Sequence, residues 1–238
     1  MQARDGSRCV ACSLGMSRMG SGPHIWLLLE IAGATVAVLG LLCLSSRTGG
    51  RVMQAAVPWV LTVGALLPTL ARGRDVHELG LCLGPVRRGM LWLAVCSLCM
   101  LIFGAIGIGV LDRLSIRPPL SGAVPRERWP MWILFQFGLV AVPEELFFRG
   151  YFLTNCLKLL RAVVKSGSSA LEVAGVCLSA GVFAVAHVLI LGSAASIFTF
   201  FPGLIFAWLF LRCGSLAPSV LLHGAANIGY MLVLGAVA

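Results

Sequence analysis

Seven apolar runs, each about twenty residues long, constrain this chain more than any other feature of its sequence. They fall at Ile25–Leu44, Val52–Leu70, Gly89–Leu111, Met131–Leu153, Leu171–Leu191, Ala194–Leu211 and Leu216–Val237. A helix of about twenty apolar residues crosses the ~30 Å hydrocarbon core of a bilayer. Backbone polar groups in lipid have to be paired within their own segment, which a helix achieves. The sequence therefore predicts an all-α, polytopic transmembrane bundle of about seven spanning helices.

The composition excludes an ordinary soluble domain. Hydrophobic residues make up 59% of the chain and charged residues 11%, whereas soluble proteins carry about 25% charged residues. The formal net charge is +9, but the basic residues lie between the apolar runs and form no lysine-rich tract or basic face. Nucleic-acid binding needs such a face. We therefore expect a lipid bilayer around the chain and no nucleic-acid partner.

The chain divides into a short leader and one membrane domain. Residues 1–24 form a polar leader that we expect to be disordered, and residues 25–238 form a single transmembrane helical domain. Cys9 and Cys12 make a lone C-x-x-C, for which metal binding or redox cycling is an alternative to a disordered tail. The first apolar run is too long for a signal-peptide core, so we interpret it as a retained span.

The connections between the runs predict the topology. Basic residues in the leader and in the even-numbered connections number eleven, against six in the odd-numbered ones. The positive-inside rule then places the N-terminus in the cytoplasm. The fifth and sixth runs are separated by Gly192 and Ser193, which allow either a tight turn or a partly re-entrant arrangement.

Two carboxylates and a guanidinium lie midway along the fourth run, at Glu144, Glu145 and Arg149. A charge at this depth costs about 2.5–3.5 kcal/mol, so an intramembrane ionisable cluster indicates a functional site. Glu145 and Arg149 are four residues apart and can pair on one face, which a purely structural salt bridge would also explain. Glu144 points about 100° away from Glu145. We expect it to meet partners on other helices.

Two histidines lie in later runs, His187 in the fifth and His223 in the last. A single histidine in an apolar helix is most often a hydrogen-bonded core residue, but two of the chain's four histidines here favour a shared site. His223 and Asn227 share a face at i and i+4. From the boundaries of the runs, His187 and His223 differ in depth, so either the helices are tilted or the boundaries are shifted. We predict that the fifth helix begins and ends later than its hydropathy indicates.

Glu30, early in the first run, is an ionisable residue that can snorkel to the interface or pair with a neighbour. Catalytic involvement of Glu30 is the less favoured interpretation. His24 at a span boundary and His77 in a polar loop are expected to be solvated.

Three motifs occur in order on three separate runs: Glu144-Glu145-x-x-x-Arg149, Phe183-x-x-x-His187 and His223-x-x-x-Asn227. Together they resemble the CAAX-protease and bacteriocin-processing family of intramembrane endopeptidases. The sequences that flank the motifs add to the resemblance; they are Phe147-Phe148-Arg149-Gly150-Tyr151 and Gly214-Ser215-Leu216-Ala217-Pro218. A weaker similarity lies upstream, at Leu79-Gly80-Leu81. The resemblance covers residues 134–230, and the protease core is expected at about 131–237.

The resemblance implies roles for these residues. Glu144 would activate water with the help of His187, and His223 with Asn227 would stabilise the oxyanion. Glu145, Arg149 and Phe183 would support the site. Elementary chemistry agrees, because peptide hydrolysis needs a base, a positioned water and donors to the carbonyl oxygen. A divalent metal such as zinc, held by Glu144, His187 and His223, is the alternative; the absence of H-E-x-x-H favours a metal-free site.

The sequence thus predicts an endopeptidase that hydrolyses a peptide bond of a membrane-anchored protein or peptide. The substrate would be a prenylated, lipid-anchored or sorted protein, or a bacteriocin precursor. A non-enzymatic immunity or scaffold protein of the same fold and a small proton-coupled transporter are the alternatives. Frequent Ala, Gly and Arg favour a bacterial inner membrane as the location.

Overall fold

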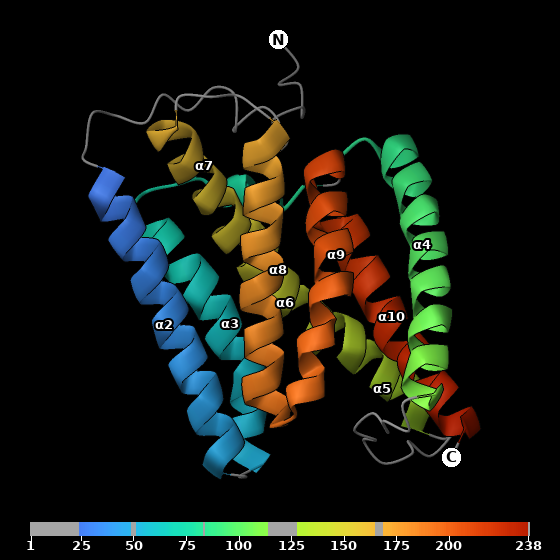
Figure 1. Cartoon of the computed structure of the whole chain (residues 1–238). Coiled ribbons are helices and arrows are strands. Elements are labelled where there is room, and N and C mark those ends of the chain that lie inside the picture. The colour runs from blue at the N-terminus through green and yellow to red at the C-terminus, as the bar shows by residue number, and fades with distance from the viewer. Residues whose placement is uncertain (1–23, 49–50, 83, 114–127, 165–168, 238) are drawn as a thin grey trace.

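The computed structural model describes residues 24–48, 51–82, 84–113, 128–164 and 169–237, and these residues form helices and no strand. In chain order the elements are α2 His24–Thr48, α3 Arg51–Ala71, η1 Val76–Leu79, α4 Val86–Arg113, α5 Trp129–Phe135, η3 Gln136–Ala141, α6 Val142–Glu145, η4 Leu146–Leu153, α7 Thr154–Val163, α8 Ser169–Leu191, η5 Ala194–Thr199, α9 Phe200–Cys213 and α10 Leu216–Val237. Each predicted apolar run coincides with one helical rod of this bundle (Figure 1).

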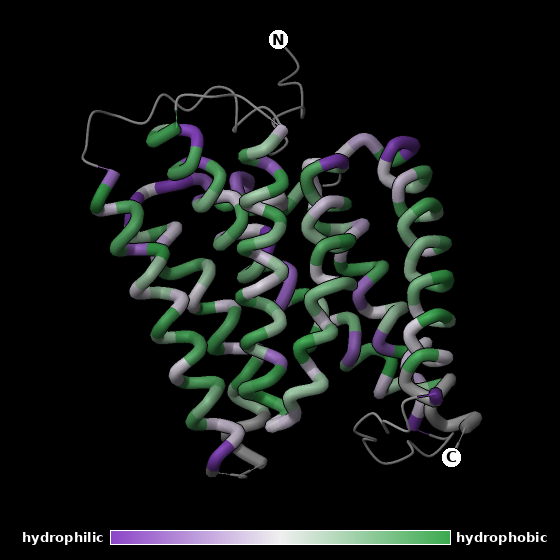
Figure 2. Tube along the Cα trace, in the orientation of Figure 1, coloured by the Kyte–Doolittle hydropathy of each residue, from purple (hydrophilic) through white to green (hydrophobic). Residues whose placement is uncertain are grey.

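Five of the rods are long and apolar enough to cross a membrane by length and composition. They are His24–Arg47, Val86–Gly107, Trp129–Val163, Ser169–Leu191 and Ala194–Cys213, and Ala55–Ala71 is a shorter apolar helix. Hydrophobic residues follow most of each helix, while hydrophilic residues gather mainly near the helix ends (Figure 2). The predicted all-α, polytopic transmembrane bundle is confirmed, and the protein is a multi-pass integral membrane protein.

The fourth rod is a composite helix, Trp129–Val163, in which α5, α6 and α7 are joined by the two π-helical segments η3 and η4. Proline explains the first segment. Pro143 has no N–H to give to the carbonyl four residues back, and its ring crowds that carbonyl. The helix adopts i→i−5 bonding instead, and Val142 N–H donates to Phe137 O. Such π segments are common at functional sites, and the two glutamates of α6 lie between them.

The composite helix is also the buried axis of the bundle. Every residue of η4, Leu146–Leu153, is buried. In Figure 1 this rod runs diagonally behind α8, from α5 at the lower right to α7 at the upper left. It packs against α3, α8, α9 and α10. By contrast, α4 lies at the outside of the bundle against α9 and α10.

The prediction for the fifth helix is wrong. We expected it to begin and end later than Leu171–Leu191, but α8 spans Ser169–Leu191 and so begins earlier and ends at the same residue. The depths of His187 and His223 are reconciled by tilt, because α10 passes obliquely behind α9 (Figure 1). The Gly192-Ser193 connection is a tight turn, in which Gly192 has φ 63° and leads directly into η5 and α9.

Candidate active site

Glu144, His187 and His223 come together from three different helices. Glu144 Oε2 lies 3.8 Å from His187 Nε2 and 3.7 Å from His223 Nε2. The exposed fraction of the side chain is 10% for Glu144, 3% for His223 and 19% for His187. The expectation that Glu144 faces other helices is therefore met, and the three side chains form a largely buried cluster.

The second nitrogen of each imidazole is held by a fixed partner. His187 Nδ1 lies 3.0 Å from Phe183 O, and His223 Nδ1 lies 2.8 Å from Glu145 Oε1. A carbonyl or carboxylate oxygen only accepts hydrogen bonds, so each Nδ1 donates. Both rings therefore turn Nε2 toward Glu144, and in a neutral ring that nitrogen carries a lone pair.

Glu144 Oε2 is an unsatisfied buried acceptor. It has no hydrogen-bond partner within the described part of the chain. Its separations of 3.7 and 3.8 Å from the imidazole nitrogens exceed the ~3.2 Å of a direct N–H···O bond. A buried polar atom left without a partner costs about 1–3 kcal/mol, so its presence in a folded protein calls for an explanation.

The predicted pair of Glu145 and Arg149 is present and completely buried. Arg149 Nη1 lies 2.9 Å from Glu145 Oε1, with both side chains 0% exposed. Arg149 Nη2 donates to Gly203 O on α9 at 3.2 Å, and its guanidinium lies 4.3 Å from the centroid of the Phe183 ring. Glu145 thus joins the ion pair to His223, and we call Glu144, Glu145, Arg149, His187 and His223 the Glu–His cluster.

Phe183 packs against both imidazole rings of the Glu–His cluster. Its ring centroid lies 4.3 Å from that of His187 and 5.7 Å from that of His223. Phe206, which our sequence analysis did not single out, stacks on His223 at 4.8 Å. Nothing in its spacing distinguished Phe206 from other apolar residues of the sixth run.

Asn227 is placed differently from the other predicted residues. Its Nδ2 donates to Gln136 Oε1 at 3.0 Å, and no hydrogen bond joins it to the Glu–His cluster within the described residues. Gln136 was also missed by the sequence analysis. The available signal was an uncharged amide inside the fourth apolar run, which is a weak one because an amide is less costly there than a charge.

The metal alternative was compared with the geometry. Zinc bound by three ligands at ~2.0–2.1 Å in a tetrahedral site would hold them about 3.4 Å apart. Glu144 Oε2 lies 3.7 and 3.8 Å from the two imidazole nitrogens. Among the residues that the structure describes, no group of three or more His, Cys, Asp and Glu is arranged to hold a metal ion. The arrangement therefore does not fit zinc as it stands. Cys9 and Cys12 lie outside the described residues.

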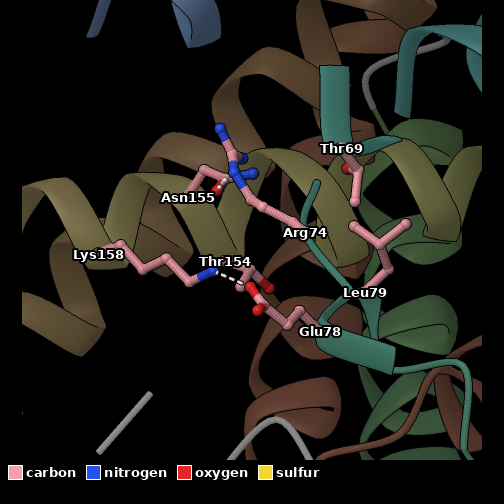
Figure 3. A pocket seen from close by; sticks show the side chains of 7 residues that line it. All are labelled: Thr69, Arg74, Glu78, Leu79, Thr154, Asn155 and Lys158. Atoms are coloured by element: carbon pink, nitrogen blue, oxygen red, sulfur yellow. Dashed lines mark hydrogen bonds and ion pairs between the residues drawn. The ribbon is translucent and has the colours of Figure 1, made fainter. Parts of the chain in front are cut away.

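A second polar cluster, the loop cluster, lies where η1 meets the composite helix. It consists of Glu30, Arg72, Arg74, Glu78, Asn155 and Lys158. Figure 3 shows Lys158 of α7 paired with Glu78 of η1, and Asn155 beside Arg74, whose Nη1 donates to Asn155 Oδ1 at 2.9 Å.

Glu30 is the centre of the loop cluster. Arg74 Nη2 donates to both of its oxygens at 2.7 and 2.6 Å, and Arg72 Nε donates at 3.1 Å. The Tyr151 hydroxyl donates to it at 3.2 Å. Of the two outcomes expected for Glu30, pairing is the one observed. His77 is exposed, as expected.

The sequences that flank the three motifs meet around the end of η1 and the residues that follow it. Leu216 N–H donates to Gly80 O at 3.0 Å, and Ser215 Oγ hydrogen-bonds to Cys82 O. A Cβ on Gly150 would lie 2.7 Å from Leu79 O, so only glycine allows this approach of η1 to η4. Leu79-Gly80-Leu81 thus packs against both Gly150 and the start of α10.

The fold and the cluster define a class: a polytopic helical membrane protein with a buried glutamate–histidine centre. Residues 126–229 match the family described as Rce1-like, type II CAAX prenyl endopeptidase. This segment contains the whole Glu–His cluster, and the match supports the resemblance to the CAAX-protease family that the three motifs indicated. Neither the comparison with curated proteins nor that with solved structures gave a significant match.

Proposed function

We propose that this protein is an intramembrane endopeptidase of glutamic type in which Glu144 activates water. One observation carries the proposal: Glu144 Oε2 is buried, lacks a hydrogen-bond partner in the described residues, and faces two imidazole nitrogens at 3.7 and 3.8 Å. These separations are too long for direct hydrogen bonds, and we propose that a water in contact with all three atoms supplies the missing bonds. A carboxylate without a competing donor can accept a proton from that water.

The hydrolytic step follows from these contacts. Glu144 takes one proton from water while the water oxygen bonds to the carbonyl carbon of the peptide. His187, whose Nδ1 is held by Phe183 O, assists by accepting from the water through Nε2. The carbonyl oxygen becomes negative and receives a hydrogen bond from Asn227, and one from His223 Nε2 when that ring carries a second proton beside the one that Nδ1 gives to Glu145. The proton on Glu144 then passes to the leaving nitrogen, the C–N bond breaks, and the carboxylate is regenerated.

Glu145, Arg149 and Phe183 hold this geometry without touching the substrate. Glu145 accepts from His223 Nδ1, Arg149 pairs with Glu145, and the Phe183 ring lies against the guanidinium of Arg149. Pre-organised groups around a reaction centre cost no reorganisation during the reaction. The proposed protease core is residues 131–237, within a single membrane domain of residues 25–238.

The proposed substrate is a membrane-associated protein or peptide. The matched family is described by CAAX prenyl substrates, which carry a lipidated cysteine three residues before the C-terminus. We propose that the end of the bundle with Arg72, Arg74, Lys158 and Arg161 faces the cytoplasm, following the positive-inside rule. The N-terminus would lie on the same side, in a bacterial inner membrane.

The test is cleavage of a fluorogenic farnesylated peptide ending in Cys-a-a-X by the full chain in liposomes. We expect cleavage by the wild type and none by Glu144→Gln or His187→Ala. Mass spectrometry of new N-termini in membranes expressing wild type or Glu144→Gln covers other substrates. Cleavage by the Glu144→Gln variant, or the absence of any Glu144-dependent product in both assays, would overturn the proposal.

Metal dependence is tested in the same assay. Treatment with a chelator followed by dialysis should leave the rate of cleavage unchanged if Glu144 and His187 activate the water without a metal ion. Loss of activity that zinc restores would instead assign Glu144, His187 and His223 to a metal site.

A further inference from the structure

We propose that Gln136 is a positioning residue, which orients the amide of Asn227 toward the substrate carbonyl. This inference rests on the proposed function and adds a residue that lies outside the three motifs. Asn227 Nδ2 donates to Gln136 Oε1 at 3.0 Å, across the contact between η3 and α10. Both side chains are partly buried.

An amide nitrogen has two hydrogens, and this explains what the contact does. Asn Nδ2 can donate twice, so when Gln136 accepts one hydrogen the direction of the second is set by the plane of the amide. A donor acts on an oxyanion only when it is aimed at the position where charge develops. Without an acceptor at Gln136 the Asn227 side chain would be free to rotate about χ2.

The π segment η3 brings Gln136 to the correct face of its helix. Residues eight apart in an α-helix, such as Gln136 and Glu144, point about 80° away from each other. In this protein both face α10: Glu144 lies 3.7 Å from His223 Nε2, and Gln136 contacts Asn227. In the i→i−5 hydrogen-bonded segment η3 each residue turns through a smaller angle about the helix axis than in an α-helix. This smaller rotation removes the 80° difference in direction between Gln136 and Glu144. Pro143 therefore has an indirect role in placing Gln136.

The neighbouring residues fix the two helices against each other at this point. A Cβ on Gly224 would lie 2.4 Å from the ring of Phe137, so the Phe137 side chain occupies a space that only glycine leaves open. Gly224 lies directly after His223, and Phe137 directly after Gln136. The interlocked ring thus holds η3 and α10 in the register at which Gln136 meets Asn227.

A double-mutant cycle tests the proposal with the farnesylated peptide as the substrate. Gln136→Met removes the acceptor at similar volume, and we expect kcat to fall about tenfold with KM unchanged. Asn227→Ala is expected to lower kcat about 10²–10³-fold. In the Asn227→Ala background, Gln136→Met should have no further effect, because Gln136 acts only through Asn227.

The control is Leu134→Ala, at a side chain that is 68% exposed on the same helix and contributes nothing to the site. It should leave kcat and the thermal midpoint in detergent at wild-type values. A full kcat for Gln136→Met, or equal losses in both backgrounds, overturns the positioning role. Activity of Glu144→Gln would overturn the proposed function instead, so the two failures are distinguishable.

Discussion

Two largely buried glutamates, Glu144 and Glu30, differ in their partners although each has 10% of its side chain exposed. Glu30 accepts hydrogen bonds from Arg72, Arg74 and Tyr151 at 2.6–3.2 Å. Glu144 Oε2 accepts none from the described residues, and its nearest ionisable neighbours are the two imidazole nitrogens. Burial alone therefore does not distinguish a paired carboxylate such as Glu30 from Glu144, the carboxylate that we propose to be reactive.

The same contrast holds for the clusters around these two residues. Buried polar atoms without a partner in the described residues include Glu144 Oε2, Glu145 Oε2 and Arg149 Nε of the Glu–His cluster, and no atom of the loop cluster. Unsatisfied buried groups reduce stability, and proteins keep them where the chemistry needs them. The loop cluster has the contacts of a structural connection between η1, α2 and α7, and the unsatisfied atoms of the Glu–His cluster support its proposed role as a reaction centre.

The strongest test of this contrast compares Glu144→Gln with Glu30→Gln. Glu144→Gln should lower the turnover of the farnesylated peptide by about 10²–10⁴-fold, since the amide cannot accept a proton from water. Its thermal midpoint should stay near the wild-type value, because no hydrogen bond to Oε2 is lost. Glu30→Gln should keep the turnover rate and lose about 1–3 kcal/mol of unfolding free energy. The reverse pattern would show that we have assigned the two roles to the wrong residues.

Next in size is the effect of Arg149→Met on stability. The substitution leaves Glu145 as a buried carboxylate without its cation, which typically costs about 3–5 kcal/mol. Chemical unfolding in detergent measures the loss, and Glu145→Gln in addition should recover much of it. Arg72→Met is the control, because Arg72 is 50% exposed and pairs with Glu30 at the surface. Equal losses for the two arginine variants would contradict the assignment of Arg149 to a desolvated pair.

Much of the Glu–His cluster was predictable because it depends on regular helical spacing. The i, i+4 spacing predicted the pair of Glu145 and Arg149, and the 100° step between residues predicted that Glu144 faces other helices. The contact between Gln136 and Asn227 was not predictable in this way. It depends on the π segment, which α-helical periodicity does not reveal.

Helix tilt and loop contacts were likewise beyond the sequence. Hydropathy gives the length of a span, while its tilt is set by packing against neighbouring helices. That is why we predicted shifted boundaries for the fifth helix, with tilt as the alternative explanation of the difference in depth between His187 and His223. The pairing of Glu30 with Arg74 depends on how the connection after α3 folds back, and no periodic pattern records this fold.

Gly150→Ala tests whether the two clusters are mechanically linked. Gly150 follows Arg149 directly, and its Cβ would lie 2.7 Å from the backbone oxygen of Leu79. Backbone shifts that relieve such overlaps cost about 1–3 kcal/mol. We expect a loss of stability in this range together with a lower kcat, because η4 carries Arg149. Gly181→Ala on α8 is the control, since its Cβ would meet no atom within 4 Å. Wild-type stability for Gly150→Ala would contradict a mechanical link between the loop cluster and the Glu–His cluster.

The smallest expected effect is that of Lys158→Met in the loop cluster. Lys158 pairs with Glu78, with 11% and 27% of their side chains exposed. Partly solvated pairs of this kind contribute up to about 1 kcal/mol, and salt near 1 M shortens the range of the attraction to ~3 Å. Unfolding should therefore show a small loss at low salt that fades at high salt, with unchanged cleavage of the peptide. A loss that persists in high salt would mean that the pair is desolvated like Arg149 and Glu145. Satisfaction of hydrogen bonds, rather than solvent screening, would then be the only physical difference between the two clusters.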